Sequence, residues 1–286
     1  MINNTTLRLL PFIILVAIIF VCSSCGNNIS DGGSSKNSSR DNLILTAAND
    51  KNSSAPAINF SALDNTCIGW GPGKIKEHQR PSDAQSCNLK FKEYNAVFVG
   101  ENTNKVYLTF DEGYENGYTA PILDTLKEKK VKAVFFVTYD YVKRNPELVK
   151  RMIDEGHTVG NHSYSHPSVP SKTTEEMKSE VMRLHDYVKN EFNYEMTLFR
   201  FPMGEYSTRS LAVVKNCGYK SVFWSFAYVD WKTDAQPDAK ESIEKVVNGA
   251  HNGAIYLLHA VSSTNNAILG SVIDDVRKLG YEWSTL

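Results

Sequence analysis

From Lys105 onward, short apolar runs alternate with amphipathic stretches, and many of these cycles close on a glycine. An apolar run followed by a stretch with a period of 3.6 residues is the pattern of a strand followed by a helix. The runs predict seven strands, at 106–110, 131–137, 158–160, 198–200, 221–224, 254–258 and 281–285. Strands that alternate with helices form mostly parallel sheets covered by helices.

The helices between these strands can be located from the signals at their ends. One helix is expected at 120–130, and another begins at Pro146, with Asn145 as its cap, and ends at Gly156. Thr173 and Glu176 have the spacing of a capping box. Further helices are expected to begin near positions 207, 238 and 265.

Unusual polar residues stand at or just beyond the carboxyl ends of the predicted strands. If they converge, they ring one mouth, as the loops of a βα barrel do, whereas in an open sheet the first and last would lie far apart. We therefore predict an α/β fold, a distorted and incomplete (β/α) barrel of about seven parallel strands. The residues are Asp111, Glu112, His162, His166, Arg200, Asp230, Trp231 and His259.

The first 25 residues are apolar but lie outside this pattern. Arg8 is their only charge, and it precedes an uncharged stretch, 9–21, that is shorter than the roughly 20 residues of a membrane span but suits an export signal. Small residues directly before Cys25 resemble the processing site of bacterial lipoproteins, with Cys25 as the lipid carrier. The alternatives are a cleaved secretory signal and an uncleaved anchor. Each predicts a membrane-attached or exported protein outside the cytoplasm.

Composition divides the rest of the chain. Residues 26–57 are rich in Gly, Asn and Ser and are expected to form a flexible tether. Residues 58–104 are expected to be an accessory segment of the fold, and 105–286 to form the main domain. A formal net charge of −1 and a pI near 6.7 provide no basic surface for nucleic acid. We expect a monomer.

The cysteines are compatible with export. Cys67 and Cys87 lie before the first clear strand, and they could form a disulfide in an oxidising compartment or remain two thiols. Cys217 ends an amphipathic pattern and is expected to be a small buried apolar residue.

His162 and His166 are four residues apart on a loop that Pro167 closes, a spacing that lets both imidazoles reach one cation. One surface and one structural histidine is the alternative. Asp111 and Glu112 could divide the work between proton removal and metal binding, or form a solvated turn.

Three other polar residues could complete this chemistry. His259 could protonate a departing amine, or be a buried residue at a strand end. Asp230 could orient His259, or cap a turn. Arg200 could fix the charge of a carboxylate, or form a plain surface salt bridge.

Five segments, in this order, resemble the motifs of the NodB-homology polysaccharide deacetylases, carbohydrate esterase family 4. They are 109–113 (TFDEG), 162–166 (HSYSH), 200–204 (RFPMG), 224–231 (WSFAYVDW) and 257–259 (LLH). The sequence at 109–119, 224–231 and 258–262 is similar to that of one branch of the family, the delta-lactam-biosynthetic de-N-acetylases of spore cortex peptidoglycan. The resemblance covers about residues 105–286 and places the protein at the cell wall or spore envelope.

The resemblance implies a role for each matching residue. Asp111 matches the catalytic base, Arg200 the residue that steadies it, His259 the general acid and Asp230 the residue that tunes this histidine. His162 and His166 match ligands of one divalent ion, zinc or alternatively cobalt or manganese.

The oxyanion and substrate positions follow in the same way. The backbone N–H of Met203 matches the oxyanion donor, and Trp231 and Tyr139 are assigned to the substrate groove. Glu112 stands where most of the family has a metal-binding Asp, so it is a candidate third ligand with a longer side chain.

The implied reaction is removal of the N-acetyl group from amino sugars of peptidoglycan. The branch points to peptide-free N-acetylmuramic acid, on the route to muramic delta-lactam. One alternative is deacetylation of N-acetylglucosamine in peptidoglycan or in chitooligosaccharides. Another, suggested by Glu112, is a carbohydrate-binding lipoprotein without activity.

Overall fold

The structure is a computed structural model that describes residues 58–73 and 77–286. The predicted N-terminal signal, its Cys25 and the tether up to residue 57 lie outside the described residues. Within the described part, no helix has the length and apolar character needed to cross a membrane.

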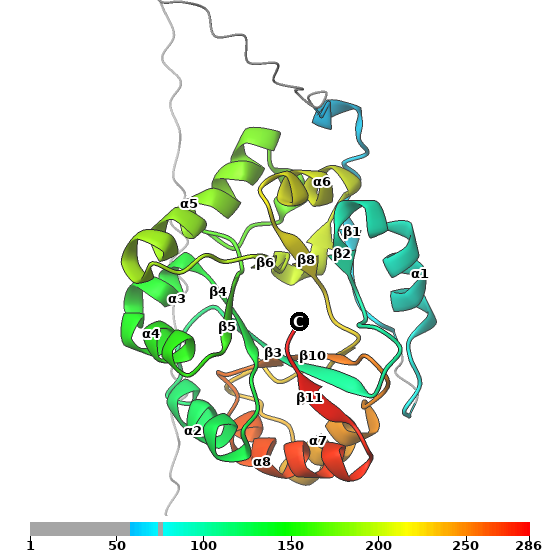
Figure 1. Cartoon of the computed structure of the whole chain (residues 1–286), viewed down its shortest axis with the longest axis vertical. Helices are drawn as coiled ribbons and strands as arrows, with labels where there is room; N and C mark the ends of the chain where they lie inside the picture. The colour runs from blue at the N-terminus through cyan, green and yellow to red at the C-terminus, as the bar shows by residue number, and fades with distance from the viewer. Residues whose placement is uncertain (1–57, 74–76) are drawn as a thin grey trace, which may run out of the picture. The chain divides into compact units, whose positions relative to one another are not determined.

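Nine strands form one sheet in which every pairing is parallel. The order is β2-β8-β6-β5-β4-β3-β10-β9, and β11 pairs with the start of β3. The strands follow an arc (Figure 1), and β2 and β9 at its two ends do not pair, so the barrel is incomplete as predicted. The strands are β2 (Ala96–Val97), β3 (Lys105–Glu112), β4 (Val134–Val137), β5 (Thr158–Asn161), β6 (Leu198–Phe199), β8 (Lys220–Val222), β9 (Phe226–Ala227), β10 (Ile255–His259) and β11 (Glu282–Ser284).

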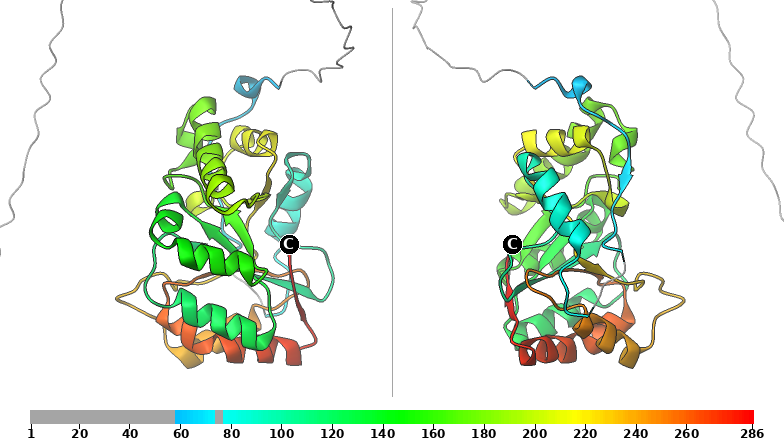
Figure 2. Two further views of the ribbon diagram at one scale, coloured as in Figure 1. Left: turned by 60° about the vertical axis from the view of Figure 1, so that its left-hand side comes forward. Right: turned by 90° about the vertical axis from the view of Figure 1, so that its right-hand side faces the viewer.

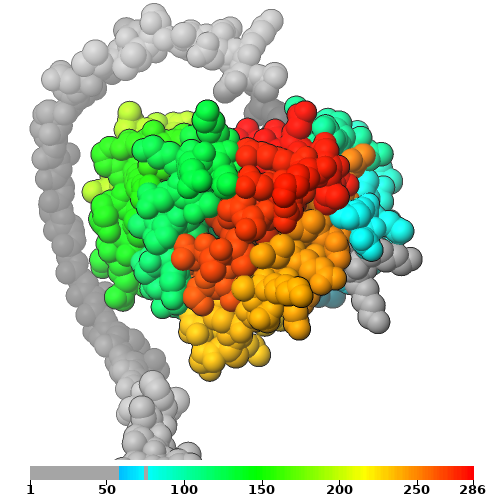
Figure 3. Space-filling view, turned by 90° about the horizontal axis from the view of Figure 1, so that it is seen from below, coloured from blue at the N-terminus to red at the C-terminus, as the bar shows by residue number. Residues whose placement is uncertain are grey.

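Helices lie on the outer side of this arc (Figures 1 and 2). Two of them, α7 and α8, pack against each other and cover one side of the molecule (Figure 3). The helices are α1 (Ser82–Lys90), α2 (Thr119–Lys129), α3 (Tyr139–Arg144), α4 (Pro146–Asp154), α5 (Thr174–Phe192), α6 (Thr208–Asn216), α7 (Ala239–Asn248) and α8 (Ser263–Lys278). Short 3-10 turns are η1 (Phe60–Ala62), η2 (Lys92–Tyr94), η3 (Val169–Ser171) and η4 (Pro202–Gly204), and β1 (Ile68–Gly69) pairs antiparallel with β7 (Glu205–Tyr206).

All seven predicted strands are present, as β3, β4, β5, β6, β8, β10 and β11, with ends shifted by a few residues. The capping box of α5 is confirmed, because Thr173 and Glu176 exchange both of its hydrogen bonds. The cap at Asn145 is wrong: its side-chain amide donates to the carbonyl of Tyr141 at 3.1 Å and leaves the N-terminus of α4 uncapped. Helix α8 begins two residues earlier than predicted, with Ser262 as its cap.

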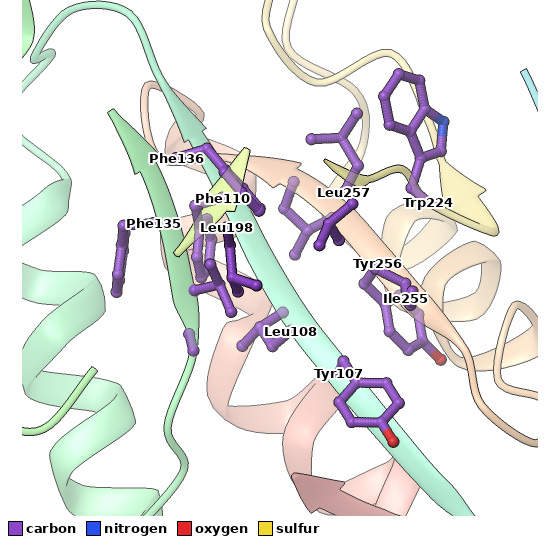
Figure 4. Close-up of a cluster of buried hydrophobic side chains, with 14 of the residues drawn as sticks. Tyr107, Leu108, Phe110, Phe135, Phe136, Leu198, Trp224, Ile255, Tyr256 and Leu257 are labelled. Carbon is purple, nitrogen blue, oxygen red and sulfur yellow. The ribbon is translucent and has the colours of Figure 1, made fainter. Parts of the chain in front are cut away.

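Aromatic and aliphatic side chains from β3, β4 and β10 belong to one buried hydrophobic cluster (Figure 4). Phe110 and Phe135 stack on neighbouring strands, with ring centroids 5.2 Å apart. A Cβ at Gly160 would come within 2.5 Å of the Phe136 ring, so only glycine lets this ring lie close to β5. The Phe136 ring in turn supports a buried arginine of the site described below.

The segment before β3 is part of the fold. β2 joins the main sheet beside β8, and Trp70 packs edge-on against Phe98 at 4.7 Å while its indole N–H donates to the carbonyl of Trp224. Cys67 and Cys87 are free thiols, so the structure agrees with two separate thiols and not with the alternative of a disulfide between them. Cys217 is also free and half-buried against the core.

Candidate active site

A pocket of about 730 Å³ opens at the carboxyl ends of the strands. This volume is within the range of small-molecule sites. Of the predicted residues, six line it: Asp111, His162, His166, Met203, Trp231 and His259. The barrel prediction is confirmed in its main consequence, because residues from β3, the β5 loop, η4 and β10 converge on one mouth.

The predicted base and acid are neighbours in the sheet. β10 pairs with β3 so that His259 lies opposite Asp111. In-register residues of paired strands point to the same face, so both side chains enter the pocket. Thr109, two residues before Asp111 in β3, points to the same face because side chains alternate along a strand.

Arg200 fixes the charge of Asp111. Its Nη1 donates to Asp111 Oδ1 at 2.8 Å and to Thr109 Oγ1 at 2.7 Å, and the guanidinium lies 4.2 Å above the Phe136 ring. Its Nε and Nη2 donate to the carbonyls of Val222 and Phe223. Burial alone would raise the pKa of Asp111, but the charge of Arg200 holds that pKa below its ordinary value. Asp111 is therefore ionised at neutral pH, as a base must be.

Asp230 raises the pKa of His259, whereas Arg200 lowers the pKa of Asp111. Its Oδ1 accepts from His259 Nδ1 at 2.7 Å, and its Oδ2 accepts from the His259 backbone N–H at 2.9 Å and from Asn265 at 2.6 Å. Burial would lower the pKa of His259, but the hydrogen bond to Asp230 and its charge raise that pKa above the ordinary value. Because Nδ1 is held by Asp230, Nε2 is the nitrogen left to face a substrate.

The histidine pair has the character of metal ligands. His162 Nδ1 lies 2.9 Å from the carbonyl of Arg200, so Nδ1 is assigned as the protonated nitrogen. Burial lowers the pKa of His162 to about 4, so the ring is neutral at pH 7. Its bare Nε2 then lies 3.5 Å from Asp111 Oδ2, with no proton between two acceptors. A cation beside these two acceptors would relieve this contact. The ring centroid of His166 is 4.8 Å from that of His162, so both imidazoles lie close enough to share such an ion.

Hydrogen bonds to α5 fix the loop that carries these histidines. The Glu180 carboxylate accepts from the backbone N–H of Ser165 at 2.8 Å and from its hydroxyl at 2.7 Å. The Glu180 carbonyl accepts from the N–H of Tyr164. Ser163 and His166 have φ of 68° and 57°, a left-handed conformation that is costly for these residues. These bonds stabilise the loop in that shape.

Glu112 does not line the pocket. It follows Asp111 in β3, so its side chain points to the other face of the sheet, where both carboxylate oxygens are buried without a hydrogen-bond partner. Burial, followed by the charges of Glu115 and Asp111, raises the pKa of Glu112 well above its ordinary value. In residues 58–73 and 77–286 no three His, Cys, Asp or Glu side chains form a group that could hold a metal ion. The imidazole pair fits a divalent ion in donor chemistry, whereas Glu112, on the other face of the sheet, is not placed to bind the same ion.

The other predicted residues form the walls. Met203 has φ of 58°, which turns its backbone at the pocket surface, and its role as an oxyanion donor stays a prediction. Trp231 lies edge-on to His259, with ring centroids 5.5 Å apart. Tyr139 is one residue from the lining residues Thr138 and Asp140 and stacks on the lining residue Tyr164 at 4.2 Å.

Sequence reasoning missed several residues that support the site. Thr109 could have been found, because alternation along β3 places it beside Asp111 on one face. Nothing in the sequence pairs Asn265 with Asp230, or Glu180 with the histidine loop, since these contacts are made by helices 35 and 15 residues further along the chain.

Comparison with known proteins agrees with this geometry. Residues 99–222 match the polysaccharide deacetylase family. The peptidoglycan-N-acetylmuramic acid deacetylase PdaA of Bacillus subtilis is 40% identical over 232 residues, which are 80% of this chain and 88% of the relative. A peptidoglycan-N-acetylglucosamine deacetylase of Bacillus cereus is 31% identical over 66% of this chain and 89% of its own length.

The fold is shared with solved structures as well. The structure of Bacillus subtilis PdaA, described as a family 4 carbohydrate esterase, matches with a TM-score of 0.75 and 40% identity, covering 78% of this chain and 96% of that one. The shared fold and the high coverage of the relatives agree with the five motifs in the sequence. The chain therefore belongs to the NodB-type polysaccharide deacetylases, carbohydrate esterase family 4.

Proposed function

We propose that the protein hydrolyses the N-acetyl group of peptide-free N-acetylmuramic acid in peptidoglycan. The observation that carries the chemistry is the pair of polar dyads at the ends of β3 and β10, in which Arg200 lowers the pKa of Asp111 and Asp230 raises the pKa of His259. Two titratable groups with pKa values moved in opposite directions, facing one pocket, are the arrangement expected of a base and an acid. The muramic acid assignment is supported by the 40% identity to a relative named for that substrate.

In the proposed reaction Asp111 removes a proton from the water that attacks the acetamide carbon. A divalent ion held by His162 and His166 would polarise the acetamide carbonyl and acidify that water when bound. The backbone N–H of Met203 would donate to the oxyanion, an interaction worth about 3 kcal/mol for a well-placed donor. His259 then gives its Nε2 proton to the amine as the C–N bond breaks. The products are acetate and a free amino sugar.

The freed amine of muramic acid can close on the lactyl carboxyl of the same sugar. We propose that the product enters the route to muramic delta-lactam in spore cortex, as the similarity at 109–119, 224–231 and 258–262 suggests. The site of action would be the outer face of the cytoplasmic membrane or the spore envelope, supported by the signal pattern that ends at Cys25. Cys25→Ala should release the protein from membranes if this residue carries a lipid, and unchanged membrane retention would contradict lipidation.

A second candidate function is deacetylation of N-acetylglucosamine in peptidoglycan, supported by the Bacillus cereus relative. The test is acetate release by purified residues 58–286 with zinc, cobalt or manganese added. Peptide-free peptidoglycan and chitooligosaccharides would be compared at equal acetyl concentration. Faster release from peptide-free peptidoglycan supports the muramic assignment, and equal or faster release from chitooligosaccharides overturns it. Release from neither would indicate a carbohydrate-binding protein.

A further inference from the structure

An arginine is stacked against the wall of the pocket. The guanidinium carbon of Arg183, on α5, lies 3.7 Å from the centre of the Tyr164 ring. Tyr139 stacks on the same ring at 4.2 Å, with 18° between the two planes. Two groups so close to one ring centre cannot share a face, so Tyr164 lies between Tyr139 and Arg183. Tyr164 lines the pocket, so Arg183 is one aromatic ring away from its wall.

The stack is braced from the same helix. Tyr187, one turn after Arg183 on α5, meets the Tyr139 ring edge-on at 4.9 Å. Aromatic pairs of this geometry add stability beyond that of the area they bury. Arg183 is thus held in place by side chains that are themselves fixed, and little conformational freedom remains to be lost on binding a ligand.

The charge of Arg183 is not used within the described part of the protein. There its guanidinium forms neither an ion pair nor a hydrogen bond, and it lies over the face of the Tyr164 ring. The acid one turn earlier, Glu180, instead binds Ser165 through both carboxylate oxygens. A guanidinium that stacks through its face keeps its N–H edge free for a carboxylate.

The pocket itself supplies no other fixed cation of this kind. Among the described residues its lining contains no Lys or Arg, while it contains the carboxylates of Asp111 and Asp140. Asp140 is paired with Arg144 at 2.8 Å, which leaves no spare charge at that position. His259 in the lining is assigned to the reacting acetamide, so a substrate carboxylate that lies beside Tyr164 would find its positive partner in Arg183.

We propose that Arg183, stacked on Tyr164, binds the carboxylate of the sugar that enters the pocket. The lactyl ether of peptide-free muramic acid carries such a group, and N-acetylglucosamine carries none. The inference rests on the proposed function and extends it, because it assigns the choice between the two sugars to one side chain. Arg183 is then a specificity-determining residue that does not touch the reacting acetamide.

The test compares kcat/KM of the wild type and Arg183→Met on two glycans. One is peptide-free peptidoglycan with free lactyl carboxylates, and the other is the same material with those groups converted to methylamides. We expect Arg183→Met to lower kcat/KM on the free acid tenfold or more, through KM, and to leave the methylamide unchanged. Arg183→Lys should restore part of the loss, and added salt should weaken only the free-acid reaction.

Lys178→Met is the matched control. Lys178 is also a cation of α5 that lies over an aromatic ring, that of Phe60 at 5.1 Å, but Phe60, unlike Tyr164, does not line the pocket. This variant should keep the wild-type preference for the free acid. Binding of both glycans to the same Arg183 variants in an Asp111→Asn background gives a readout that does not depend on turnover.

The outcomes separate the inference from the proposed function. Equal losses on free acid and methylamide would show that Arg183 only supports the wall, and would overturn the inference while the function stands. A wild type that prefers chitooligosaccharides to both muramic glycans would overturn the proposed function, and the inference with it.

Discussion

Replacing Asp230 by Asn should move the alkaline limit of activity to lower pH. Asp230 Oδ1 binds His259 Nδ1, while Oδ2 accepts from two donors, the His259 N–H and the Asn265 amide. An asparagine amide can keep one acceptor, but its NH2 group then faces donors. The variant therefore loses the negative charge and part of the hydrogen bonding that raise the pKa of His259.

The size of the shift can be judged within the same protein. His251 is fully buried without a carboxylate partner, and burial lowers its pKa to about 4. His259 is also desolvated, yet its pKa lies above 6.5, because Asp230 outweighs burial. An opposite charge at this distance typically moves a pKa by about 1 to 3 units, or about 1.4 kcal/mol per unit.

A general acid must be protonated, so the activity is full below the pKa of His259 and falls as pH rises through it. In Asp230→Asn we expect the alkaline limb of kcat/KM to move down by about 1 to 3 pH units. Titration of His259 by NMR should show the same displacement without any turnover. Asp234→Asn, which makes the same change of charge in the same loop, should leave both unchanged. An alkaline limb that stays in place in Asp230→Asn would refute the pairing as the source of the raised pKa.

Three further predictions concern the base, the metal loop and acid stability. Asp111→Asn should lower kcat by about 10² to 10⁴ with metal content unchanged, measured by acetate release and elemental analysis, and retained activity would refute its role as base. Glu180→Ala should weaken divalent-ion binding by calorimetry about tenfold or more, since it frees the loop of His166, whereas Glu175→Ala on the same helix should not. His251 has a pKa of about 4 in the folded state against 6.5 in the unfolded state. The unfolded state therefore binds more protons between these values, and the stability decreases as the pH is lowered. This histidine alone should account for about 2 kcal/mol of unfolding free energy lost between pH 7 and pH 5, and urea unfolding of His251→Gln should show a shallower pH slope.

Much of the fold follows from local signals in the sequence. The apolar runs predict seven of the nine strands of the main sheet, because most of these seven are buried and have few polar interruptions. End signals such as Thr173 and Ser207 locate helix starts, since their side chains satisfy backbone groups within the same turn. Asn145 fails because its amide bonds backward to Tyr141, in a helix that the apolar pattern does not reveal.

The candidate site is predictable only where strand order places residues. Asp111 and His259 end buried strands, so a parallel sheet must bring them to one edge. The side of the sheet that Glu112 faces follows from the two-residue alternation, and it separates this residue from the histidines despite its place beside Asp111. Contacts from helices, such as those of Asn265 and Arg183, depend on tertiary packing that a single sequence does not encode in any local pattern.

The most direct test of the central claim is mass spectrometry of the sugars released from peptide-free peptidoglycan after treatment with the protein, with and without a chelator. We predict that muramic acid residues lose one acetyl group each, that N-acetylglucosamine residues keep theirs, and that both Asp111→Asn and the chelator prevent the loss. Acetyl groups lost from glucosamine alone, or from neither sugar, would contradict the account.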